Sequence, residues 1–137
     1  MFVELDDIIY QTNLELVQIE DTGFCNMHCK HCRASSQPHK MINMEQMKKI
    51  LKFIKKVKSD DFKLTFSGGE PFLNKNLYKY ICMAKDIGLN QIVITTNASM
   101  IDDEMLSKLN DLQLKFLCIQ ISLDSINEEE HDTFRKY

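Results

Sequence analysis

The sequence lacks several features that would place the protein in other classes. No apolar run approaches the roughly 20 residues needed to span a bilayer, and the N-terminus "MFVELDDIIY" has no basic-then-apolar export pattern. No linker or low-complexity segment divides the chain, which predicts a single domain over residues 1–137. The net charge of −3 provides no basic excess for a general nucleic-acid binder. We therefore expect neither a membrane nor a nucleic acid as a partner.

With no export signal, the chain is expected to stay in the cytoplasm, where thiols remain reduced. Its five cysteines are then interpreted as metal ligands or buried apolar residues rather than as disulfides. Three of them stand within the eight residues "CNMHCKHC", at positions 25, 29 and 32. This segment is the densest group of soft ligands in the chain.

The hydrophobic pattern alternates between strand and helix periods. Strands are predicted at 16–21, 62–66, 91–96 and 116–124, and helices at 43–58, 76–88, 102–112 and 127–137. Asn43 is a predicted N-cap and Gly88 a predicted helix end. This order favours an α/β fold of about four parallel βα units with right-handed crossovers.

Sites in such folds collect where strands end and loops begin. The cysteine segment follows the first predicted strand, "SGGEP" the second, "TTN" the third and "SLD" the fourth. In the fourth predicted strand, the side chains on one face are apolar and suited to packing against helices: Leu117, Ile119, Ile121 and Leu123. The side chains on the other face become more polar towards Ser122 and Asp124, which indicates a site at that end of the sheet.

Three closely spaced cysteines allow two kinds of metal site. Zinc would need a fourth ligand, which His28 or His31 would supply. An iron–sulfur cluster would take the three thiolates and leave one iron open for a reactive role. The spacing by itself leaves both alternatives open.

The combined motifs resemble the radical S-adenosylmethionine superfamily. Its Cys-x3-Cys-x2-Cys signature matches Cys25, Cys29 and Cys32, and "GGEP" (68–71), "TTN" (95–97) and "ISLDS" (121–125) follow in the family's order. The stretch "HDTFR" (131–135) is similar to one found in members that mature peptides and proteins. The resemblance runs from about residue 14 to the C-terminus.

The resemblance implies a [4Fe–4S] cluster on the three cysteines, with S-adenosylmethionine chelating the open iron. An external electron donor would reduce the cluster, which then cleaves S-adenosylmethionine so that hydrogen is abstracted from a peptide or protein substrate. The glycines Gly68 and Gly69 would let the backbone approach the methionine moiety because they lack a Cβ. The same resemblance implies further cofactor-binding residues: His31 near the adenine, Ser122 and Asp124 at the ribose or carboxylate, and Glu70 and Asn97.

The family core usually has six βα units, and this chain supplies four. We therefore interpret residues 1–137 as the N-terminal part of such a core, without its last two units. The alternatives are half of a split enzyme completed by a second polypeptide, a non-catalytic remnant, and a small zinc-binding module.

Overall fold

The computed structural model describes residues 2–11, 13–34 and 38–136. Its centre is a four-stranded sheet in the order β3 (Leu14–Thr22), β4 (Lys58–Gly68), β5 (Gln91–Thr96) and β6 (Phe116–Ile121). All three strand pairs are parallel. The connections contain α1 (Met44–Val57), the 3₁₀ turn η1 (Pro71–Leu73) with α2 (Leu77–Asp86), and α3 (Asp103–Asp111), while α4 (Glu128–Arg135) follows β6. The predicted α/β arrangement of four parallel βα units is confirmed.

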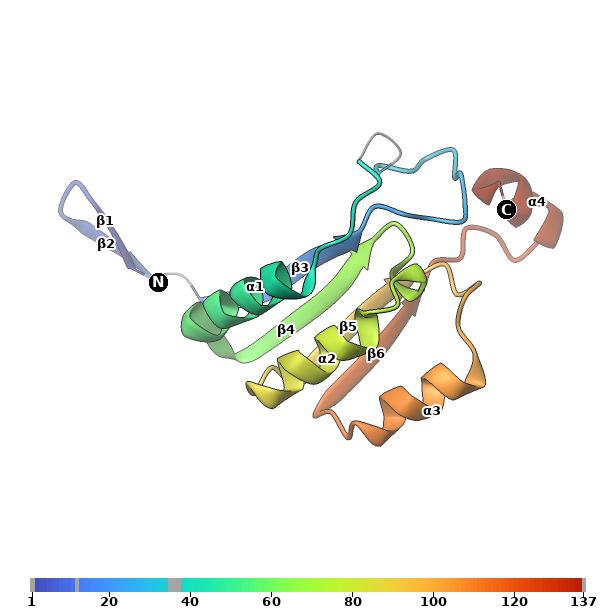
Figure 1. Ribbon diagram of the computed structural model, residues 1–137. Helices are drawn as coiled ribbons and strands as arrows, with labels where there is room; N and C mark the ends of the chain where they lie inside the picture. The colour runs from blue at the N-terminus through green and yellow to red at the C-terminus, as the bar shows by residue number, and fades with distance from the viewer. Residues whose placement is uncertain (1, 12, 35–37, 137) are drawn as a thin grey trace.

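Helices α1, α2 and α3 cover one face of the sheet (Figure 1). The buried core forms there, from apolar residues of alternate strand positions and of the helix faces: Ile19, Phe62, Leu64, Phe66, Ile92 and Ile94 with Met47, Leu51, Ile54, Tyr80, Ile81 and Leu109. On the opposite face of the sheet the side chains of Gln18, Lys63 and Gln120 are exposed. This one-sided core leaves the strand ends free to carry polar residues.

The predicted helix ends agree with the local chemistry. The Asn43 side chain accepts a hydrogen bond from the Gln46 N–H while the Gln46 side chain accepts one from the Asn43 N–H, which is a complete capping box. Gly88 ends the α2 segment with φ +86°, a conformation that favours glycine. The final helix stops at Arg135, and Tyr137 of the predicted 127–137 helix lies outside the described residues.

Three expectations about strands need correction. The first two sheet strands are longer than predicted, since β3 begins at Leu14 and β4 extends over Lys58–Gly68. The last strand ends at Ile121, so Ser122 and Asp124 lie in the loop that follows. The side chains of Ile121 and Leu123 are 59% and 66% exposed, because the helix-covered core extends only to Leu117 and Ile119 of this edge strand.

The sequence pattern also missed an N-terminal hairpin. Strands β1 (Phe2–Leu5) and β2 (Ile8–Gln11) pair antiparallel and form a separate sheet that projects away from the main one (Figure 1). The two-residue turn consists of Asp6 and Asp7, with φ of 49° and 63°. Positive φ at both positions is the hairpin-turn geometry, and aspartate tolerates it better than most residues.

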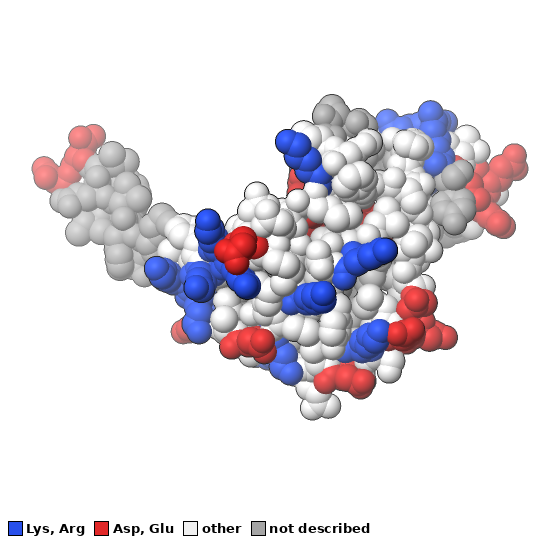
Figure 2. Space-filling view, viewed as in Figure 1, with Lys and Arg blue, Asp and Glu red and all other residues white. Residues whose placement is uncertain are grey.

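Charge is unevenly distributed over the surface. Basic side chains gather over α1, which carries five exposed lysines, and acidic ones lie over the first turn of α4 (Figure 2). Among the described residues, no helix is both long enough and apolar enough to cross a membrane.

Candidate functional site: a cleft at the carboxyl ends of the strands

The loop that follows β3 leaves and returns beside the same strand. The Gly23 N–H donates to the Lys40 carbonyl at 2.7 Å, and the Ile42 N–H donates to the Asp21 carbonyl at 3.0 Å. These bonds close the segment between residues 23 and 42 at its base. The cysteine loop, which we define as residues 25–32, is therefore held at the carboxyl edge of the sheet.

The cysteine loop forms one wall of a cleft of about 400 Å³. The remaining walls come from the glycine turn after β4 and from the ends of β5 and β6. Of the cluster- and cofactor-binding residues implied by the resemblance, eight line this cleft: Cys25, Cys29, Cys32, His31, Gly68, Gly69, Asn97 and Ser122. His28, the other possible zinc ligand, lines it as well. Residues from four separate chain segments thus meet where the parallel strands end.

The glycine turn packs directly on the start of the cysteine loop. The Gly69 N–H donates to the Thr22 carbonyl at 2.7 Å, and the Glu70 N–H donates to the Phe24 carbonyl at 2.8 Å. A Cβ on Gly69 would lie 2.1 Å from the Phe24 carbonyl oxygen, and one on Gly68 2.4 Å from that of Thr22. The absence of a Cβ at both glycines is therefore required by the neighbouring backbone, and the approach of their own backbone to the methionine moiety stays a prediction.

Glu70 does not line the cleft. Its carboxylate is 0% exposed and accepts hydrogen bonds from the Phe72 N–H (3.1 Å), the Thr96 hydroxyl (2.7 Å) and the Asn97 N–H (2.8 Å). The structure therefore gives Glu70 a positioning role, in which it ties the turn after β4 to the end of β5, rather than the ligand contact proposed from the sequence. Thr96 was not singled out from the sequence, although a buried hydroxyl beside a buried acid is a natural partner.

Asn97 connects the end of β5 to the cysteine loop. Its side chain amide donates to the Asn26 side chain oxygen at 3.0 Å and lies 3.9 Å from the Cys25 sulfur. Ser122 is placed beside it because the Ser122 N–H donates to the Thr96 carbonyl at 2.9 Å. Both residues therefore present polar groups to the cleft.

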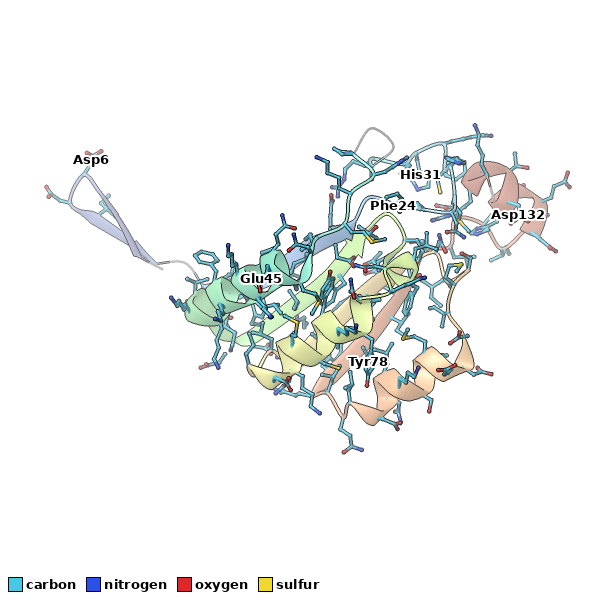
Figure 3. All side chains as sticks on the ribbon, in the orientation of Figure 1. Asp6, Phe24, His31, Glu45, Tyr78 and Asp132 are labelled. Atoms are coloured by element: carbon cyan, nitrogen blue, oxygen red, sulfur yellow. The ribbon has the colours of Figure 1, made fainter. Side chains whose placement is uncertain are left out.

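Asp124 and His31 face α4. The Asp124 carboxylate accepts from Arg135 Nε at 2.5 Å and does not line the cleft. The His31 ring is stacked on Phe134, with ring centroids 4.8 Å apart and an interplanar angle of 13°. Figure 3 shows His31 on the loop beside α4, which carries Asp132. One face of the imidazole is thus covered by a phenyl ring, so the contact with adenine implied by the resemblance would have to use the other face.

The three sulfurs differ in their surroundings. Burial raises the pKa of the Cys25 thiol and the charge of Glu70 adds to this, while the Met27 N–H, 3.4 Å from the sulfur, opposes it. The Cys29 sulfur lies 4.0 Å from Arg135 Nη1. A cysteine thiol becomes a ligand when a metal centre displaces its proton.

The cleft offers three soft donors, the sulfurs of Cys25, Cys29 and Cys32. Tetrahedral zinc needs four ligands around one point, whereas a cubane is held by thiolates at separate irons. Cys25, Cys29 and Cys32 would hold such a cluster, which supplies one-electron chemistry when bound.

A second buried acid lies beneath the glycine turn. Asp21 is 0% exposed; its Oδ2 accepts from the Asn74 side chain amide at 2.6 Å, while Oδ1 has no hydrogen-bond partner within the described part of the chain. Burial, reinforced by the nearby charge of Glu70, raises the pKa of Asp21 from 3.8 to about 7. No pattern in the sequence pointed to this residue, because its burial depends on the packing of η1 against the sheet.

A parallel α/β sheet with a three-cysteine loop and a glycine turn at its carboxyl edge defines the class of cluster-binding βα-barrel proteins. The model of the family described as "Radical SAM superfamily" matches residues 19–137. The chain therefore belongs to the radical S-adenosylmethionine superfamily, whose members use a [4Fe–4S] cluster and S-adenosylmethionine.

Two curated relatives and one solved structure illustrate the range of this family. The chain is 30% identical over 132 residues to the AdoMet-dependent heme synthase of Methanosarcina barkeri, covering 93% of this chain and 36% of that protein. It is 32% identical over 123 residues to the antilisterial bacteriocin subtilosin biosynthesis protein AlbA of Bacillus subtilis, covering 85% and 25%.

The solved structure is that of Streptococcus suis SuiB bound to the precursor peptide SuiA. It superimposes with a TM-score of 0.75 over 90% of this chain and 27% of SuiB, at 19% identity. SuiB has also been crystallised with S-adenosylmethionine. This likeness concerns the fold, and the chain spans only a minor part of each of the three proteins.

Proposed function

We propose that this chain forms the cluster- and S-adenosylmethionine-binding part of a radical enzyme. The observation that carries the proposal is the convergence of Cys25, Cys29 and Cys32 with Gly69 and Asn97 on one cleft at the carboxyl edge of a parallel sheet. When bound and reduced by an external electron donor, a cluster held by these cysteines would supply one-electron chemistry for the cleavage of S-adenosylmethionine. The cysteine loop holds the cluster, and the polar groups at the ends of β5 and β6 orient the nucleoside.

The metal content tests this proposal. Chain reconstituted with iron and sulfide without oxygen is expected to be brown and to hold about four irons and four sulfides. Cys29→Ala should lose most of that iron. Cys82→Ala provides the matched control, because Cys82 lies half-buried in α2 and should leave the iron content unchanged. A colourless wild-type protein that binds one zinc would refute the cluster.

For S-adenosylmethionine, the test is the paramagnetic spectrum of the reduced cluster. Addition of S-adenosylmethionine should change this spectrum, since its amino and carboxylate groups would occupy the open iron. Ser122→Val is expected to weaken this response while iron content stays the same, because Ser122 lines the cleft from the loop after β6 and not from the cysteine loop. Equal responses in both proteins would remove Ser122 from the nucleoside site.

For the substrate, we propose a peptide or protein. The stretch "HDTFR" (131–135) supports this, as does the likeness to AlbA, which is named for subtilosin biosynthesis, and to SuiB, which was crystallised with a precursor peptide. The heme synthase relative favours a tetrapyrrole as the second candidate. Fluorescence anisotropy with short peptides encoded beside the gene, compared with an iron porphyrin, separates the two: saturable porphyrin binding without peptide binding would refute the peptide proposal.

A further inference from the structure

The carboxyl end of α4 is docked on the cysteine loop through the backbone. The Lys30 N–H donates to the Phe134 carbonyl at 3.0 Å, and the His28 N–H donates to the Lys136 carbonyl at 3.3 Å. Carbonyls in the last turn of a helix have no partner within the helix, and here the loop supplies N–H groups to two carbonyls at the helix end. The loop therefore takes part of its hydrogen bonding from a helix about a hundred residues further along the chain.

Arg135 lies at the centre of this contact. Its side chain is only 10% exposed, its Nε donates to the Asp124 carboxylate at 2.5 Å, and its Nη1 lies 4.0 Å from the Cys29 sulfur. A buried guanidinium is costly unless it is paired, and its planar set of donors can serve two acceptors at fixed angles. One side chain thus joins the loop after β6 to a thiol of the cysteine loop.

The other arginine of the chain offers a contrast. Arg33 also lines the cleft, but its side chain is 84% exposed and pairs with Glu20 at 3.1 Å. An exposed pair of this kind is screened by water and contributes little. Arg135 is largely shielded from water and lies close to one of the three thiols. Its positive charge therefore acts more strongly on a negatively charged group held there.

We propose that Arg135 is a positioning residue that fixes the cysteine loop against α4 and, through its charge beside Cys29, raises the reduction potential of the cluster. This inference rests on the proposed cluster site. Donors and positive charge around cluster sulfurs stabilise the more negative, reduced state. Residues beyond the three-cysteine signature would then set how easily the cluster accepts its electron.

The first test uses the apo chain and measures hydrogen exchange at the amides of His28 and Lys30. Arg135→Gln should accelerate their exchange at least tenfold while the amides of β5 stay unchanged. Lys108→Gln serves as the matched control, because it removes an exposed ion pair with Glu104 on α3. Asp124→Asn, which keeps Arg135 but removes its partner, should loosen the same two amides and guards against a variant that fails to fold.

The second test measures the midpoint potential of the reconstituted cluster. Arg135→Gln should lower the reduction equilibrium constant about tenfold, or about 59 mV for a one-electron couple. Arg135→Lys should restore most of the potential, since charge is kept, but not the slow exchange, since lysine lacks the planar fork. Exchange and potential in Arg135→Gln that match the Lys108→Gln control would overturn the inference. A wild-type chain that binds no cluster would refute the proposed function, and the exchange test would still decide the role of Arg135 in the loop.

Discussion

The buried carboxyl of Asp21 predicts a stability that depends on pH. Its folded-state pKa is raised from 3.8 to about 7, so between these values the folded chain holds a proton that the unfolded chain releases. The free energy of unfolding should therefore fall as pH rises through this window and level off above pH 7. At about 1.36 kcal/mol per pH unit, the part lost between pH 5 and pH 8 is about 3 kcal/mol.

Asp21→Asn removes this titration while it keeps an oxygen that can accept from Asn74. The asparagine amide does not titrate between pH 5 and pH 8, so any cost of placing its nitrogen at the unpartnered position is the same at both pH values. The assay is urea unfolding of the apo chain at pH 5 and pH 8. The stability difference between variant and wild type should shift by about 3 kcal/mol in favour of the variant at pH 8.

Asp61 provides a control of opposite sign. The Gln91 side chain donates to its carboxylate and lowers the pKa of Asp61, so its contribution to stability is present at neutral pH and lost in acid. Asp61→Asn should therefore not reproduce the gain at pH 8. A wild type and an Asp21→Asn variant with parallel pH profiles would refute the raised pKa of Asp21 and the burial argument behind it.

Other substitutions test the packing of the site. Gly69→Ala should displace the Phe24 carbonyl and reduce both iron content and thermal stability. Gly88→Ala is the control: Gly88 has φ +86° but no heavy atom within 4 Å of an added Cβ, so this variant should lose only about 1–2 kcal/mol of stability and keep its iron. Equal iron loss in both variants would contradict the role of the close contact at Gly69. Glu70→Gln should destabilise the fold by about 1–3 kcal/mol in thermal unfolding. The Glu70 carboxylate accepts three hydrogen bonds, and in the variant an NH2 group would replace one of its oxygens and face a donor. Asn43→Ala should lower the free energy of unfolding by about 1 kcal/mol through loss of the capping box, and iron binding should stay intact. Loss of iron in this variant would show that α1 is coupled to the cleft.

The sequence predicted the fold where local signals were strong. Helix α1 has a cap and a continuous apolar face, and β5 lies at the predicted residues because its apolar run is bounded by polar residues at both ends. The hairpin was missed because its turn uses Asp6 and Asp7 in place of the glycine or asparagine that usually marks positive φ. The exposure of Ile121 follows from the position of β6 at the sheet edge, which no local pattern reveals.

The site was predictable in its residue types and less so in their roles. The spacing of the cysteines and the positions of Asn97 and Ser122 after their strands predicted the cleft. The burial of Glu70 and the crowding at Gly69 depend on how separate segments pack, so the resemblance, which implied ligand contacts at both residues, did not reveal their internal contacts. The pairing of Arg135 with Asp124 and Cys29 is equally a property of the tertiary structure.

The contact between Arg135 and Cys29 spans 106 positions, and this has a consequence for biosynthesis. Contacts of such sequence separation form late, because the intervening chain must be ordered first. A ribosome that has synthesised the cysteine loop has already added β3 but has yet to add β4, β5, β6 and α4, which also hold the loop in place. Cluster insertion into the finished loop geometry is therefore expected to follow release of residue 135 from the exit tunnel, and the thiols must be kept from oxidation until then.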